Sequence, residues 1–187
     1  MLELPQKGWV LLVMGVAGSG KTTIGRGLAA ALGVRFFDAD DFHSPENIQK
    51  MARGEPLGDA DRAPWLAALR DRIEAVLDAR DCAVLACSAL KQAYRQQLRV
   101  DAQRVPVVFL NGSPELICAR LRERRGHFAH ESLLGSQLAA LEPPDDALEV
   151  DIAAPPQEVV HTILARLHFP HDRIPGPAGA APRRGVP

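Results

Sequence analysis

The chain contains little of what marks a secreted or a membrane-spanning protein. It has three cysteines among 187 residues, and their odd number and wide spacing, at Cys82, Cys87 and Cys118, fit neither a disulfide framework nor a CxxC metal site. No apolar run approaches the roughly eighteen residues that a membrane-spanning helix needs. We therefore expect reduced thiols in a soluble, cytoplasmic protein without a membrane partner.

An excess of charge of either sign is also missing. The formal net charge is -1, with 24% charged and 47% apolar residues. This composition excludes a polycation that binds nucleic acid, and it is too apolar for a disordered chain. The length suits one domain, which we expect over residues 1–167. Residues 168–187 are rich in Pro, Gly and Ala without apolar periodicity, which predicts a disordered tail.

What the chain does contain is the phosphate-loop pattern GxxxxGK[ST], as GVAGSGKT at residues 15–22. Small residues let such a loop curl so that its backbone N–H groups point at phosphate oxygens. Lys21 would then reach the β- and γ-phosphates, and the Thr22 hydroxyl is placed for Mg²⁺. An apolar run of buried-strand type precedes the loop at residues 9–14 and a helical stretch follows it, as the motif requires. The predicted ATP-binding residues are Gly15, Val16, Ala17, Gly18, Ser19, Gly20, Lys21, Thr22 and Thr23.

Two carboxylates follow the second predicted strand, residues 34–38. Asp38 and Asp40 lie where the carboxyl end of a parallel strand would face a bound nucleotide, and they share a face if the extended conformation persists. The strand at residues 82–88 ends in Cys87 and Ser88 rather than in the aspartate that many phosphate-loop proteins use for Mg²⁺. Asp38 or Asp40 must then serve the metal, which favours a small-molecule kinase over a switch GTPase.

Two basic helical segments complete the candidate site. Lys91, Tyr94 and Arg95 have the spacing of one helical face, which could bind an anionic substrate or could be a solvated basic surface. Arg120 and Arg124 share a face just before Gly126, where a closing arginine could neutralise the transferring phosphoryl group. The alternative for these two arginines is an ordinary charged helix end.

Five apolar strands alternate with helices, which predicts an α/β fold of three layers. The expected strands are residues 9–14, 34–38, 82–88, 105–110 and 148–152, forming a parallel sheet with helices on both faces and a small lid. Right-handed crossovers and analogy with other phosphate-loop proteins favour the strand order 2-3-1-4-5.

Over about residues 10–167 the chain resembles the gluconate kinase family. The matching blocks are GVAGSGKTT, DADDFH with SPENIQKM, GEPLGDADRAPWL, CSALKQAYR, and RLRERRGHF with the late VDI. The resemblance implies a homodimeric phosphate-loop kinase that uses ATP and Mg²⁺ to phosphorylate the 6-hydroxyl of D-gluconate. Adenine is expected between the lid and the loop after Asp151.

The resemblance also suggests roles for individual residues. Lys21, Arg124 and Arg120 would neutralise the transferring group, and Asp40 would orient or deprotonate the sugar hydroxyl. Thr22 and Asp38 would hold the metal, although Asp38 and Asp40 could exchange roles. Substrate binding would fall to Asp40, His43, Lys91, Arg95 and His127.

Two other interpretations compete. Shikimate kinases share GKTTIGR and an acidic pair after the second strand, but they carry a glycine triplet where this chain has residues 88–91, SALK. A nucleotide-binding module without transferase chemistry is the alternative from a different class. The NKxD guanine motif of switch proteins is not matched by NGSP at residues 111–114.

Overall fold

A computed structural model describes residues 2–99, 101–123 and 127–169, with the side chains of residues 127–133 outside the description. At its centre is a sheet of five parallel strands in the order β3-β4-β2-β5-β6. Counted along the chain this is 2-3-1-4-5, so the predicted α/β fold and strand order are confirmed. The strands are β2 (Trp9–Met14), β3 (Arg35–Asp38), β4 (Cys82–Ala86), β5 (Val107–Asn111) and β6 (Leu148–Asp151).

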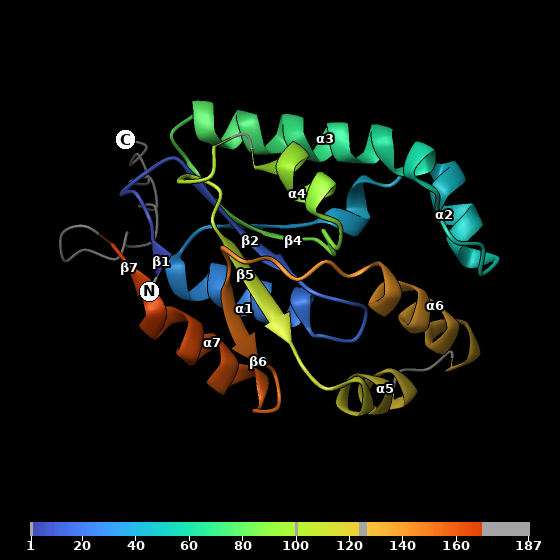
Figure 1. The fold of residues 1–187 in the computed structure, drawn as a ribbon. Coiled ribbons are helices and arrows are strands. Elements are labelled where there is room, and N and C mark those ends of the chain that lie inside the picture. The colour runs from blue at the N-terminus through green and yellow to red at the C-terminus, as the bar shows by residue number, and fades with distance from the viewer. Residues whose placement is uncertain (1, 100, 124–126, 170–187) are drawn as a thin grey trace, which may run out of the picture.

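The central strand β2 is apolar throughout because both faces of the sheet are covered (Figure 1). Leu11 and Val13 pack with α1 (Lys21–Leu32) and α7 (Pro156–Arg166), whereas Val10 and Leu12 pack on the opposite side with α3 (Asp59–Asp78) and α4 (Gln92–Leu98). Alternate side chains of a strand point to opposite faces, so one six-residue run serves two cores. Figure 1 shows these two helical layers above and below the strands.

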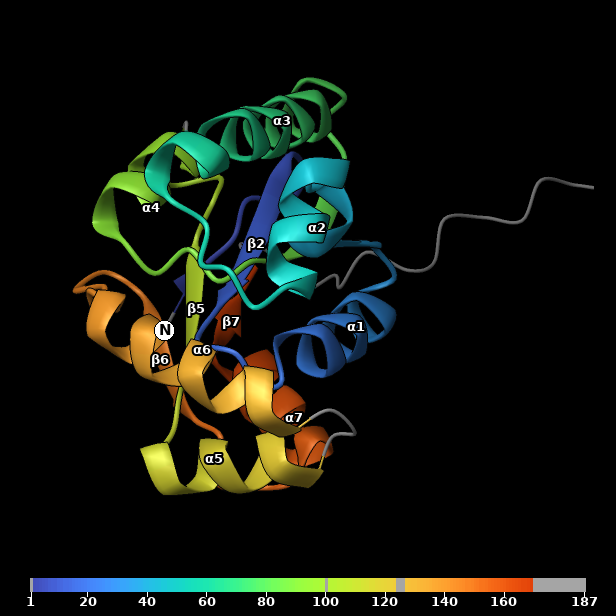
Figure 2. The same ribbon diagram turned by 90° about the vertical axis from the view of Figure 1, so that its right-hand side faces the viewer.

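The remaining helices gather at the carboxyl end of the sheet. They are the 3₁₀ turn η1 (Ala39–Phe42), α2 (Pro45–Ala52), α5 (Pro114–Glu123) and α6 (His127–Ala140). Figure 2 looks at this end of the molecule and shows α2, α5 and α6 around the end of β2. Elements from distant parts of the chain therefore surround the phosphate loop.

Side-chain hydrogen bonds mark the starts of two helices. Helix α3 begins at Asp59, where the Asp61 carboxylate accepts a hydrogen bond from the Gly58 backbone N–H. The polar stretch from Ser44 contains α2, whose first turn is capped by the Ser44 hydroxyl.

A second, two-stranded sheet was not predicted. β1 (Leu2–Glu3) pairs in parallel with β7 (Leu167–His168), and Leu4 N donates to His168 O at 2.9 Å. His168 was expected in a disordered tail, but this pairing places it in a strand. Phe169, also expected in the tail, packs against the core with its ring centroid 6.3 Å from that of Trp9. The rest of the predicted tail, residues 170–187, lies outside the described residues. Within the described part of the chain, no helix is long and apolar enough to cross a membrane.

Candidate functional site

The phosphate loop connects β2 to α1. Gly15 has φ +154°, and a Cβ added there would lie 2.6 Å from Ser19 Oγ and 2.9 Å from the Leu110 carbonyl oxygen. Gly20, the residue before α1, has φ +91°, a conformation that favours glycine. The loop can follow this path only with glycine at these positions, which agrees with the curl that the motif predicts.

Within the loop, Lys21 Nζ donates to Val16 O at 3.0 Å, so the ammonium group lies over the loop's own backbone. The Ala17 N–H donates to Gln137 Oε1 of α6 at 2.6 Å. Gln137 is not identifiable from the sequence, because nothing local in the chain marks a contact between residues 120 positions apart. The phosphate loop is thus linked directly to α6.

Asp38 lies beside the loop. Thr22 Oγ1 donates to Asp38 Oδ2 at 2.8 Å, and Asp38 Oδ1 accepts from Asp40 N at 3.2 Å. The hydroxyl and the carboxylate are the hard oxygen ligands that Mg²⁺ prefers. Among the described residues no group of three or more His, Cys, Asp or Glu side chains could hold a metal, so a divalent ion here would need oxygen atoms from a phosphate or water as well.

Asp40 does not continue the strand that ends at Asp38. The chain turns into η1 at Ala39, so Asp38 and Asp40 do not share the face of an extended strand. The pKa of Asp40 is raised by burial and by the charge of Asp38, with Lys21 and His43 acting in the opposite direction. The carboxylate is therefore a stronger base than an ordinary aspartate.

His43 stacks on Trp65, with ring centroids 4.6 Å apart and an interplanar angle of 9°. Trp65 Nε1 donates to Ala39 O at 2.7 Å, which fixes the stack against η1. His43 Nδ1 is buried and has no partner among the residues that the structure describes. Burial lowers the pKa of His43, so the ring is neutral near pH 7.

Lys91 contacts a carboxylate of the chain itself. Its Nζ lies 2.8 and 3.0 Å from the two oxygens of Asp59, and the Tyr94 hydroxyl donates to the same group. Arg62 lies 5.9 Å from the Tyr94 ring centroid, and its charge also contributes to lowering the pKa of His43. Arg62 is not among the predicted substrate-binding residues, although it lies in the block GEPLGDADRAPWL that resembles gluconate kinases. This cluster shows that the region can bind a carboxylate.

The predicted position of Arg95 at the substrate is wrong. This residue was expected beside Lys91 at the substrate, but its side chain is 5% exposed, and Nη1 donates to Ala89 O at 3.1 Å and Leu90 O at 2.9 Å. Lys91 precedes α4 and is not part of it, so the assumed common helical face does not exist. Through these hydrogen bonds the Arg95 guanidinium stabilises the turn after β4, where Ala89 has φ +44°.

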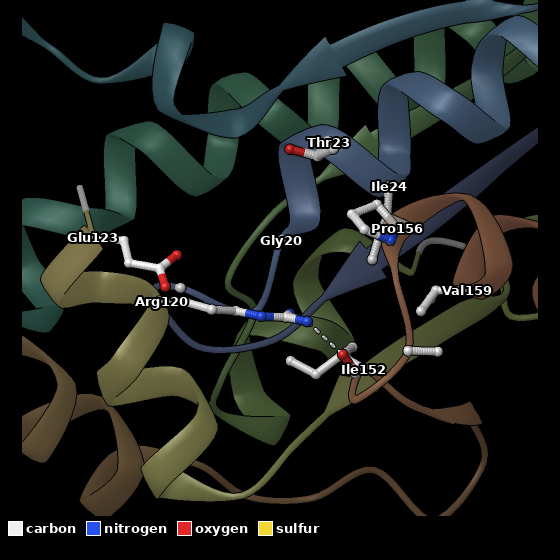
Figure 3. Close-up of a pocket in the computed structure, with 10 residues that line it drawn as sticks. Gly20, Thr23, Ile24, Arg120, Glu123, Ile152, Pro156 and Val159 are labelled. Atoms are coloured by element: carbon white, nitrogen blue, oxygen red, sulfur yellow. Dashed lines mark hydrogen bonds between the residues drawn. The ribbon is translucent and has the colours of Figure 1, made fainter.

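Arg120 lies at the wall of a cavity of about 400 Å³ beside the phosphate loop. Its Nη2 donates to Ile152 O at 2.6 Å, and Figure 3 shows the side chain extended below Gly20 towards that carbonyl. This position differs from the expected one at the transferring phosphoryl group. The cavity is lined by Gly18, Gly20, Thr23, Ile24, Arg120, Glu123, Ile152, Ala154, Pro156 and Val159. Arg124 and the His127 side chain lie outside the described residues.

Comparisons with known proteins agree on the class. The model of the shikimate kinase family matches residues 17–149. A shikimate kinase structure from Aquifex aeolicus, 24% identical with a TM-score of 0.53 over 84% of this chain and 94% of that one, supports the fold alone.

Gluconokinases are more similar. The gluconokinase of Gluconobacter oxydans is 51% identical over 136 residues, 73% of this chain and 76% of the relative. The crystal structure of a gluconokinase from Sinorhizobium meliloti is 44% identical with a TM-score of 0.77, covering 84% of this chain and 90% of that one. The chain therefore belongs to the gluconokinase family of phosphate-loop kinases.

Proposed function

We propose that the chain transfers the γ-phosphoryl group of ATP to the 6-hydroxyl of D-gluconate, giving 6-phospho-D-gluconate and ADP. The observation that carries the proposal is the position of Asp38 and Asp40. Asp38 accepts from Thr22 at the end of the phosphate loop, and Asp40 follows within one 3₁₀ turn, towards His43. A phosphoryl donor on the loop and an acceptor hydroxyl at Asp40 would therefore be adjacent. Membership in the gluconokinase family supports gluconate as the acceptor.

ATP would lie along the loop with its base in the cavity beside Arg120. The volume of about 400 Å³ is of the size that binds small ligands, and it opens onto Gly18 and Gly20 of the loop. Arg120 and Pro156 form part of its wall, and a guanidinium plane can stack on an aromatic base. This location agrees with the expectation that adenine lies near the loop after Asp151.

Thr22 and Asp38 would hold Mg²⁺, directly or through water. Their side-chain oxygens lie 2.8 Å apart, so both could reach one ion. When bound, the ion supplies positive charge to the β- and γ-phosphate oxygens. Lys21 adds a second positive charge, and we propose that it turns from Val16 O towards the phosphates.

Asp40 would accept the proton of the 6-hydroxyl as the new P–O bond forms. A hydroxyl is a weak nucleophile at neutral pH, and the raised pKa of Asp40 brings its basicity closer to that required. The neutral His43 ring follows Asp40 by three residues and would bind a second sugar hydroxyl. Lys91 and Arg62 would bind the gluconate carboxylate. This carboxylate would bind the Lys91 ammonium group either beside Asp59 or in its place.

Three further parts of the proposal rest on the family resemblance. Arg124 would neutralise the transferring phosphoryl group, and His127 would bind a substrate hydroxyl. The protein would act as a cytoplasmic homodimer with one kinase domain in each subunit.

The test is a substrate panel assayed for ADP release. We expect kcat/KM for D-gluconate to exceed that for glucose and for shikimate by about a hundredfold or more, because glucose has no carboxylate for Lys91 and Arg62 to bind and shikimate has a rigid ring. Asp40→Asn, purified in the same way, controls for contaminating kinases. Comparable turnover of glucose and gluconate, or a preference for shikimate, would refute the assignment.

A further inference from the structure

The Gln137 side chain makes a contact that the proposed reaction does not use. Its Oε1 accepts from the Ala17 N–H at 2.6 Å, and both residues are half-buried. Backbone N–H groups of a phosphate loop normally point at phosphate oxygens. A side-chain amide that binds one of them is therefore placed to set the shape of the loop.

Helix α6 packs on the core of the sheet through the turn that carries Gln137. Leu134 is 2% exposed within the core shared with β2 and α1, and Leu138 packs against the same core. Figures 1 and 2 both show α6 next to the phosphate loop. Gln137 lies between these two anchored leucines, so its position follows that of the helix.

The segment after α6 is bound to the substrate side of the site. Glu142 N donates to Leu90 O at 3.0 Å, and the Glu142 carboxylate accepts from Gln92 N. Leu90 and Gln92 are the two neighbours of Lys91, whose ammonium group already binds a carboxylate of the chain. The stretch from Gln137 to Glu142 thus connects the ATP-binding loop to the segment proposed to hold the sugar acid.

We propose that Gln137 is a positioning residue for phosphoryl transfer: by holding Ala17, it sets where the loop presents ATP relative to the substrate held near Lys91. The inference rests on the proposed kinase reaction. In-line transfer depends on the alignment of donor and acceptor, and a misplacement of about 1 Å can cost on the order of a hundredfold in rate. A neutral amide suits this position, because a carboxylate would place negative charge beside the phosphates of ATP.

Two substitutions separate the hydrogen bond from the charge. Gln137→Met keeps a long, unbranched side chain but offers only a weak acceptor, whereas Gln137→Glu keeps a strong acceptor and adds a negative charge. The matched control is Gln97→Met at an exposed position of α4. Steady-state kinetics with gluconate and ATP and the melting temperature would be measured for all three variants and the wild type.

For Gln137→Met we expect kcat to fall by about ten- to a hundredfold, with KM for gluconate within about twofold of wild type. For Gln137→Glu we expect kcat at saturating ATP to recover towards wild type while KM for ATP rises, because the carboxylate still binds Ala17 but repels the phosphates. Gln97→Met should match the wild type in every parameter.

Three results would overturn the inference. One is a Gln137→Met variant with wild-type kcat. Another is a Gln137→Glu variant with a kcat as low as that of Gln137→Met, because an acceptor for the Ala17 N–H would then not preserve the rate. The third is a loss of activity in Gln137→Met that disappears when the assay temperature is lowered well below its melting temperature, which would indicate a purely structural role. Absence of gluconate turnover in the wild type would instead refute the proposed reaction, and the inference with it.

Discussion

Replacing Arg95 with methionine should lower the stability of the protein by about 2–4 kcal/mol. The guanidinium is buried and donates to the Ala89 and Leu90 carbonyl oxygens. In the variant, Ala89 O loses this donor in buried surroundings, which costs roughly 1–3 kcal/mol. Leu90 O keeps the Glu142 N–H as a second donor and loses only one net hydrogen bond, about 1 kcal/mol. Methionine fills most of the vacated volume, so the cavity contribution is small.

Thermal unfolding followed by circular dichroism measures this effect. For a chain of this size each 1 kcal/mol shifts the melting temperature by about 2–4 °C, so we expect a decrease of about 4–16 °C. Arg70→Met is the matched control, because Arg70 is exposed and its ion pair with Glu74 lies on the surface, where such a pair is worth less than about 1 kcal/mol. KM for gluconate, measured well below the melting temperature, should change little in either variant.

The opposite pattern would refute this reasoning. Suppose that Arg95→Met had the melting temperature of the wild type but raised KM for gluconate by about tenfold, a loss of roughly 1.4 kcal/mol in binding. The guanidinium would then belong to the substrate site. Its hydrogen bonds to the turn after β4 would contribute nothing measurable.

Three further predictions concern the chemistry. Lys21→Met should lower kcat by about a hundredfold or more with an unchanged melting temperature, since a cation directed at the phosphates is lost, and a folded variant with normal turnover would contradict the site. The value of kcat/KM for gluconate should fall on acidification, because a protonated Asp40 cannot accept the proton of the hydroxyl; a profile that stays flat through the acidic range would contradict this. Arg120→Ala should mainly raise KM for ATP, as expected for a residue lining the proposed base cavity, whereas Arg124→Ala should mainly lower kcat; identical kinetics for the two variants would remove the distinction.

Local patterns in the sequence were sufficient for the phosphate loop and for the main sheet. The glycines and Lys21 of the loop are required by backbone geometry and by phosphate charge, and both requirements act within a few residues. The run at β2 is apolar on both strand faces because both are buried, which predicts a parallel sheet before any strand is paired. Asp38 could be placed near Thr22 because parallel strands end at a common edge.

The direction of side chains on short helices was decided by packing. Spacing suggested that Lys91 and Arg95 share a helical face, but α4 begins only at Gln92 and turns Arg95 inward to the carbonyls of the preceding turn. Helical periodicity states which residues share a face, not which face the core covers. The short η1 after Asp38 likewise replaced an extended continuation.

Only the tertiary structure decided the contacts that join distant segments. The pairing of β1 with β7, the Lys91–Asp59 ion pair and the Gln137–Ala17 hydrogen bond each connect residues far apart in the chain. Sequence determined the parts that obey a local rule, which are a loop that must curl around phosphate and a strand that must be apolar on both faces. A hydrogen bond between a helix and a loop 120 residues away follows no local rule, because its geometry exists only after the layers have packed.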